Sequence, residues 1–190
     1  MVLSEIKYND TNQFSKLFVD YTEQKDNLKK LISEYPKIEN FKKQIKVKSE
    51  SFDHSIRPII KTVIKNQYKR ISLNNIQKKN LNLILNKNTF TVTTGHQLNI
   101  FTGPLYFIYK IFSTINLTEI LKKKYPKYDF VPMYWMATED HDFEEINNFY
   151  CFDRVFNWDS NQSGCVGDFN TDSINNTIEE LDIEISNFKS

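Results

Sequence analysis

Three carboxylates and one imidazole stand at four consecutive positions of the sequence: Glu139, Asp140, His141 and Asp142. This density of charge is costly to bury unless a cation or a proton is shared among the side chains. His141 is a candidate general acid or base, which Asp140 or Glu139 would orient. The carboxylates are also candidate ligands for Mg²⁺ held against the phosphates of a nucleotide. The segment is therefore the first place to expect catalysis or ligand binding.

Two further interpretations of this segment stay open. A transition-metal site could combine His96, His141 and a carboxylate, although the two histidines have no regular spacing. Asp142 and Glu145 are spaced as in a capping box, so we expect Glu145 to cap a following helix. Asp142 could either cap that helix or contact a ligand.

A second polar cluster interrupts a short β-branched run that begins at Phe90. Its members are Thr94, Gly95, His96 and Gln97. Downstream, Gly103 is the expected N-cap of a long helix, and Pro104 is its expected first residue. The free N–H groups and positive dipole end of that helix would hold an anion, such as a carboxylate or a phosphate. Alternatively, Gly95 and Gly103 only permit tight turns, because the segment is neither a Walker loop nor a full dinucleotide fingerprint.

The elements that position both clusters form a predicted βαβ unit. A strand at Phe90–Thr94 precedes the long helix, and an apolar strand at Phe130–Met136 follows it. Ligands of such units collect where strands end and helices begin, and both clusters lie there. The helix is expected to pack on the sheet through an apolar stripe of Leu105, Ile108, Ile111, Phe112, Ile115 and Ile120. The predicted fold class is α/β, with a Rossmann-like core and an incomplete parallel sheet.

The first part of the chain is predicted to be helical. Apolar residues recur at helical spacing over residues 12–33, from Ser51 onward, and over residues 72–86. The second of these helices should bury Ile59 and leave Arg57 outside its buried stripe.

We expect two regions in the chain. Residues 1–88 would form a helical N-terminal region packed on the core, and residues 89–190 would form the first part of the Rossmann-like core domain. The segment Ile174–Ser190 is typical of an amphipathic helix rather than a closing strand. Because only two parallel strands are clear, the sheet would have open edges. We therefore expect an N-terminal piece of a longer protein.

The composition excludes some classes of partner. Lysine plus arginine number 25 against 24 aspartate plus glutamate, so a formal charge of +1 draws the chain to neither nucleic acid nor membrane. No targeting segment is recognised, and no window approaches the ~18 apolar residues of a membrane span. Cys151 and Cys165 fit a reducing compartment, so the expected location is cytoplasmic. Neither cysteine has a visible base partner in the sequence, and we expect both to be buried or spectator residues.

Two motifs together carry a family resemblance. The first is Thr93–Tyr106, followed by Lys110, and the second is Val131–Glu145. In order and spacing they resemble the bacillithiol-biosynthesis cysteine-adding enzymes, a family of cysteine ligases. One departure is His96, where many members are expected to have glutamine; a histidine can titrate there and a glutamine cannot.

The resemblance implies a Rossmann-like core similar to nucleotidylyl-transfer and class I synthetase folds, within a protein much longer than this chain. It also implies an enzyme that joins cysteine to the amino group of glucosaminyl malate, the last step toward bacillithiol. The implied partners are these small molecules, with no nucleic acid and no membrane. Full-length members are expected to be able to form homo-oligomers. Amide formation requires an activated carboxylate; the activating donor stays open, and ATP with Mg²⁺ is one option.

Under this interpretation, His141 does the acid–base work, and Glu139 or Asp140 orients it or recognises an ammonium group. Asp140, His141 and Asp142 would contact the amine, the cysteine or a metal-bound phosphate, and no resident metal is assigned. Substrate binding is assigned to Thr94, Gly95, His96, Gln97, Gly103 and Lys110.

Two other functions stay open. One is a metal-dependent hydrolase or nucleotidyltransferase on the same βαβ unit. The other is a binding module that keeps a sugar-acid or nucleotide pocket without turnover. The second predicts an exposed apolar face and self-association.

Overall fold

The computed structural model describes residues 4–188, and the chain folds as two units, Met1–Asp53 and His54–Ser190. All of the predicted site residues belong to the second unit. The predicted division into regions at residues 88 and 89 stays a prediction. Within residues 4–188, no helix combines the length and the apolar character needed to cross a membrane.

The first unit consists of short helices. They are α1 (Tyr8–Thr11), α2 (Lys16–Thr22), η1 (Asp26–Leu28), η2 (Ile38–Asn40) and α3 (Phe41–Ser51). The prediction of one helix over residues 12–33 is therefore wrong. The Ser15 side chain caps α2 by accepting a hydrogen bond from the Phe18 N–H, and Gln24 beyond its end has a left-handed φ of 57°. These two residues begin and end a helix that the apolar spacing alone would have continued.

The helices of the second unit begin with η3 (His54–Ile56), α4 (Arg57–Gln67) and α5 (Asn75–Leu83). The expected orientation of α4 is wrong, because Arg57 is buried and Ile59 is exposed. The Arg57 guanidinium donates to the carbonyl oxygens of Ile84 (2.7 Å) and Thr89 (3.0 Å). It thus satisfies backbone acceptors at the end of α5 and at the start of the following strand. These hydrogen bonds offset the free-energy cost of burying the charged side chain.

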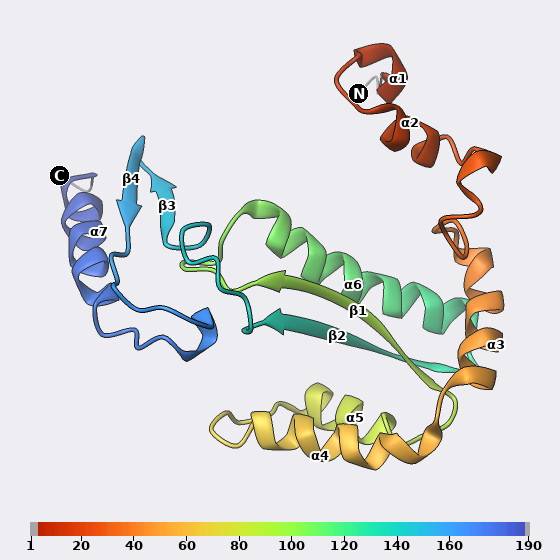
Figure 1. Cartoon of the computed structure of the whole chain (residues 1–190). Coiled ribbons are helices and arrows are strands. Elements are labelled where there is room, and N and C mark those ends of the chain that lie inside the picture. The colour runs from red at the N-terminus through yellow and green to blue at the C-terminus, as the bar shows by residue number, and fades with distance from the viewer. Residues whose placement is uncertain (1–3, 189–190) are drawn as a thin grey trace. The chain divides into compact units, whose positions relative to one another are not determined.

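Two parallel strands form the centre of the second unit: β1 (Thr89–Gln97) and β2 (Asp129–Ala137). Helix α6 (Leu105–Lys124) connects them and contacts both, and α5 contacts β2 from the other face of the sheet (Figure 1). The predicted βαβ unit is confirmed. Because Gln97 pairs with Ala137, both strands end at the same edge of the sheet.

Strand β1 is longer than predicted, because it continues through the segment expected to be a turn. Gly95 lies opposite Trp135 in the parallel register. A Cβ atom at Gly95 would lie only 2.9 Å from the backbone oxygen of Trp135. The glycine therefore permits close approach of the two strands and keeps the second polar cluster within the sheet.

The buried face of α6 differs from the predicted stripe. Thr114, Thr118 and Leu121 are buried, whereas Leu105 and Phe112 are exposed. The two threonine hydroxyls donate to carbonyl oxygens of the same helix, at 2.8 Å from the oxygen of Lys110 and 2.6 Å from that of Ile115. Small side chains with internally satisfied hydroxyls allow the helix to approach the sheet closely, so the large apolar residues are left outside.

The chain after β2 forms a hairpin and a terminal helix: β3 (Asn148–Cys151), β4 (Arg154–Asn157), η4 (Val166–Asp168) and α7 (Ile174–Phe188). The hairpin turn has positive φ at Phe152 and Asp153, as a two-residue turn of this kind requires. Helix α7 packs on β4, and the Thr177 hydroxyl donates to the oxygen of Asn157 at 2.7 Å. The predicted C-terminal helix is confirmed over its described residues.

Candidate functional site

The two predicted polar clusters meet just beyond the ends of β1 and β2. The side-chain amide of Gln97 donates from Nε2 to Oε2 of Glu145 at 2.7 Å, between residues 48 positions apart. The expectation that Glu145 caps a helix is wrong, and so is the capping alternative for Asp142, because residues 144–146 form a turn and β3 follows. The Glu145 carboxylate instead joins the first motif to the second.

Asp140 is held in its charged form. Its Oδ1 accepts the backbone N–H of Asp142 at 3.1 Å. This hydrogen bond lowers the pKa of Asp140 below its ordinary value of 3.8, and a hydrogen bond from the Gln97 side chain lowers it further. The Gln97 amide therefore lies between two carboxylates, those of Asp140 and Glu145. The amide thus links the side chains of the two acidic residues.

His141 belongs to the acidic turn, residues 139–142, which is joined to a second turn farther along the chain. A turn around Cys165 lies against it, because Val166 N–H donates to the oxygen of Asp140 (2.8 Å) and Gly167 N–H donates to that of Thr138 (3.0 Å). This places Sγ of Cys165 at 3.6 Å from Nε2 of His141. The expectation that Cys165 lacks a base partner is wrong, and its thiol is free and half-buried.

His96 and Lys110 are connected through Tyr106. Nε2 of His96 lies 2.9 Å from the Tyr106 hydroxyl, and Nδ2 of Asn99 lies 3.1 Å from Nδ1 of His96. Nζ of Lys110 donates to the oxygen of Gly95 at 3.2 Å and lies 5.5 Å from the centre of the Tyr106 ring. These groups form a cationic and hydrogen-bonding set beside the first turn of α6.

The loop that leads into α6 has an unusual backbone. Phe101, Thr102 and Gly103 have consecutive left-handed φ values of 49°, 68° and 60°. The N-cap of α6 is Pro104 and its first residue is Leu105, so the prediction of Gly103 as N-cap is wrong by one position. Gly103 is required for a different reason, since its Cβ would lie 2.6 Å from Cγ of Asn99.

The structure brings some of the predicted residues together and leaves others apart. Gln97 meets Asp140, and His96 and Lys110 meet through Tyr106, whereas Glu139 and Asp142 have exposed side chains. Thr94 lies within β1, opposite Tyr134. Among residues 4–188, no three histidine, cysteine, aspartate or glutamate side chains are arranged to hold a metal ion. His96, His141 and a carboxylate are therefore not gathered into one site.

Four residues of this region were not predicted as site residues: Asn99, Tyr106, Glu145 and Cys165. Asn99 and Tyr106 lie within the first motif, and their spacing from His96 was the available signal. Cys165 is 24 positions from His141, and no periodicity connects the two. Its position depends on Gly167, where a Cβ would lie 2.5 Å from that of Thr138.

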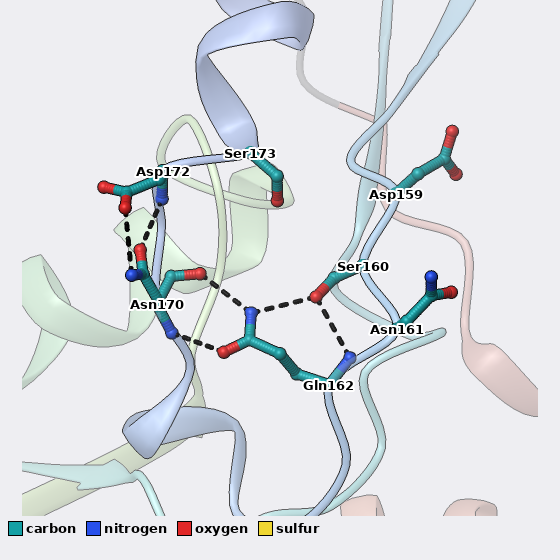
Figure 2. Close-up of a pocket in the computed structure, with 7 residues that line it drawn as sticks. All are labelled: Asp159, Ser160, Asn161, Gln162, Asn170, Asp172 and Ser173. Atoms are coloured by element: carbon teal, nitrogen blue, oxygen red, sulfur yellow. Dashed lines mark hydrogen bonds between the residues drawn. The ribbon is translucent and has the colours of Figure 1, made fainter.

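A polar cavity of about 370 Å³ lies in the loop that follows β4 (Figure 2). Gln162 spans it: its Nε2 donates to Oγ of Ser160 and to the oxygen of Asn170, both at 2.9 Å, and its Oε1 accepts the Asn170 N–H at 2.7 Å. The lining residues are Asp159, Ser160, Asn161, Gln162, Asn170, Asp172 and Ser173. These hydrogen bonds hold the loop in shape, and none of the predicted site residues lines the cavity. We therefore place the candidate site at the strand ends.

Comparison with known proteins identifies the family. The family model described as "Bacillithiol biosynthesis BshC, N-terminal Rossmann-like domain" matches residues 1–190. The chain is 49% identical over 180 residues to a protein of Flavobacterium johnsoniae, covering 95% of this chain and 34% of the relative. It is 49% identical over 185 residues to one of Flavobacterium psychrophilum, covering 96% and 35%, and 47% identical over 184 residues to one of Christiangramia forsetii, covering 95% and 34%.

Each of these relatives is named "Putative cysteine ligase BshC", and the chain spans about a third of their length. The family match extends over the whole chain, including both motifs and the parallel strands that carry them. The family inferred from the sequence is confirmed: the chain belongs to the BshC family of bacillithiol biosynthesis and corresponds to its N-terminal Rossmann-like domain.

Proposed function

We propose that the protein carrying this domain joins cysteine to the amino group of glucosaminyl malate, the last step toward bacillithiol. Membership of a family of cysteine ligases supports the ligase chemistry. The observation that carries the location of the site is the bond from Gln97 to Glu145, which joins the two motifs beside Asp140 and His141. The free thiols of Cys151 and Cys165 fit the proposed cytoplasmic location.

The carboxylates and the imidazole suit the acceptor amine. An amine attacks an activated carboxyl group only as the neutral base, although it exists mainly as ammonium in neutral water. Asp140 and Glu145 would bind the ammonium form by charge-assisted hydrogen bonds. His141, exposed and adjacent to Asp140, would accept the proton as the amine attacks.

The set formed by His96, Tyr106 and Lys110 suits an acidic group. Lys110 supplies a positive charge, Tyr106 supplies a hydroxyl, and both lie beside the N-terminal end of α6. Carboxylates are favoured near the N-terminal end of a helix and next to cations. We place the malate carboxylates of the acceptor there, whichever donor activates cysteine.

Calorimetric titration tests the proposal. The folded chain is titrated with glucosaminyl malate, cysteine and ATP in turn, with and without Mg²⁺. We expect saturable binding of glucosaminyl malate that is lost in the Asp140→Ala, His141→Ala double variant. Asp159→Ala, which alters the polar cavity instead, should leave binding unchanged. Binding that survives the double substitution, in this chain and in a full-length family member alike, would contradict the proposed site.

A second candidate is that the domain by itself binds substrate without turning it over. The observation that favours it is the exposed face of α6, where Leu105, Tyr109 and Phe112 are each more than half exposed, at 65%, 63% and 59%. Apolar faces of this kind favour association. Sedimentation analysis distinguishes the cases: self-association of the chain that weakens in a Phe112→Ser variant supports this candidate, and a monomer at all concentrations does not.

A further inference from the structure

A cysteine and a histidine from distant segments lie side by side at the strand ends. Sγ of Cys165 is 3.6 Å from Nε2 of His141, the histidine is exposed, and the cysteine is half-buried. A thiol beside an imidazole can pass its proton to the ring nitrogen as it attacks, and the sulfur then acts as the nucleophile. We propose that Cys165 is a modification site, at which low-molecular-weight disulfides form a reversible mixed disulfide with this domain.

The pair is fixed by the fold rather than by chance approach of two mobile side chains. Backbone hydrogen bonds on both sides of the contact join the cysteine turn to the acidic turn, from Val166 to Asp140 and from Gly167 to Thr138. Val166 is buried, so the turn is anchored by packing as well. The two turns therefore hold the thiol and the imidazole within reach of one another.

A carboxylate lies beside the pair. Asp140 is next in sequence to His141 and interacts electrostatically with it. The pair itself rests on the contact between Sγ of Cys165 and Nε2 of His141, which places the imidazole where it can take the thiol proton.

The exchange step needs no oxidant beyond the disulfide itself. The proton of the Cys165 thiol moves to Nε2 of His141, and the sulfur attacks one sulfur of the disulfide R–S–S–R. The S–S bond breaks, and the departing R–S⁻ takes the proton from His141. The products are Cys165–S–S–R and R–SH, and an excess of free thiol reverses the step.

The modification has a consequence for the site, and this part rests on the proposed function. An adduct on Cys165 removes the thiol from His141 and covers the turn that carries Asp140. Because His141 is the proposed acid–base group, the oxidised form of a low-molecular-weight thiol would switch the site off. The reduced form of that thiol would switch it on again, which links the site to the redox state of its own class of product.

The chain contains its own control thiol. Cys151 is also free and half-buried, but it lies in β3 opposite Arg154. The imidazole of His54 accepts a hydrogen bond from Arg57, and that of His96 lies beside Tyr106 and Asn99. Cys165 therefore has the His141 imidazole beside it, whereas Cys151 has Arg154 opposite it in the hairpin.

The experiment exposes the folded chain to oxidised glutathione, quenches it with acid at timed intervals, and measures adducts on each cysteine by peptide mass spectrometry. We expect Cys165 to react at least about tenfold faster than Cys151. In His141→Gln, the rate at Cys165 should fall toward that of Cys151, whose own rate should not change. Dithiothreitol should remove the adduct, and Cys165→Ser should abolish it at that position.

Equal rates at the two cysteines would overturn the inference. An unchanged Cys165 rate in a His141→Gln variant with native circular dichroism would also overturn it. If that variant does not fold, the rate ratio in the unsubstituted chain still decides. No substrate is present in this assay, so its failure is distinct from failure of the proposed function. Titration of the glutathione adduct with glucosaminyl malate then tests the switch, and undiminished binding would reject it.

Discussion

The strand-end site and the polar cavity of the second unit are both built from polar side chains, but by opposite means. In the cavity, Gln162 bonds to Ser160 and Asn170, all within one short loop. At the strand ends, Gln97 reaches a carboxylate 48 positions away. Groups that are close in sequence satisfy one another and shape a loop. Groups gathered from distant segments depend on the fold, and the carboxyl ends of parallel strands are where ligands of such folds commonly bind.

The largest expected difference between the two regions concerns turnover. In a full-length family member, His141→Ala in this domain should lower turnover by roughly 10²–10⁴-fold, because a positioned acid–base group contributes about that much. Asp159→Ala in the cavity should leave turnover within about twofold, since we assign it no contact with substrate. Steady-state kinetics with glucosaminyl malate measures both. A loss of less than threefold in His141→Ala would remove the proposed role.

The next effect concerns stability at the contact between the acidic turn and the cysteine turn. Gly167→Ala places a Cβ 2.5 Å from that of Thr138 and 2.8 Å from its backbone oxygen. We expect a loss of roughly 1–3 kcal/mol in the free energy of unfolding, because the two turns must separate. Denaturant unfolding measures it. Ser163→Ala, an exposed position of the same loop, is the control and should stay within about 0.5 kcal/mol.

A smaller effect is expected in the cavity. Gln162→Ala removes the hydrogen bonds to Ser160 and Asn170, and we expect a loss of about 0.5–1.5 kcal/mol in the free energy of unfolding. Asn161→Ala, which lines the same cavity without joining that set of bonds, should cost less. Glucosaminyl malate should bind both variants as it binds the unsubstituted chain. Weakened binding in either variant would reverse the assignment of the two regions.

The smallest effect is a titration. The pKa of Asp140 lies below 3.8, because the Asp142 N–H and the Gln97 side chain bond to the carboxylate. Its contribution to stability is therefore present above pH 3.8 and is lost as the pH falls through the lower folded value. Carboxyl NMR chemical shifts should show the depressed pKa. Gln97→Ala should raise it toward 3.8, and an unchanged value would remove Gln97 from the carboxylate pair.

Local patterns predicted the elements of the core well. The apolar strand before Ala137 and the amphipathic segment after Ile174 each depend on spacing within a few residues. The face of α6 that packs on the sheet could not be predicted in this way. Thr114 and Thr118 are buried there because their hydroxyls bond to carbonyl oxygens of the same helix, and the spacing of apolar residues does not indicate this. Burial of Arg57 could not be predicted from local spacing either, because the carbonyl oxygens that accept its hydrogen bonds belong to residues 27 and 32 positions away.

Only part of the candidate site could be predicted, namely the part that follows from the regular elements. Parallel strands end at one edge, so the βαβ pattern was enough to place Gln97 near Asp140. The partners Glu145 and Cys165 depend on irregular turns, whose paths are set by single close contacts such as that of Gly167 with Thr138. The spacing of apolar residues in the sequence does not predict such contacts. The functional roles of all these residues stay proposals.

The left-handed run before α6 has a consequence for the thermodynamics of binding. Phe101 and Thr102 each adopt a backbone conformation that costs a non-glycine residue roughly 1–3 kcal/mol. Burial of Ile100, and packing of the Phe101 ring with its centroid 4.5 Å from that of Phe149, hold this conformation within the domain. The entrance to the helix is thus ordered during folding, so a ligand that binds beside it loses little further chain entropy. The free-energy cost of the left-handed conformation at Phe101 and Thr102 therefore lowers the folding stability of the domain. It does not lower the affinity for a ligand that binds beside the helix.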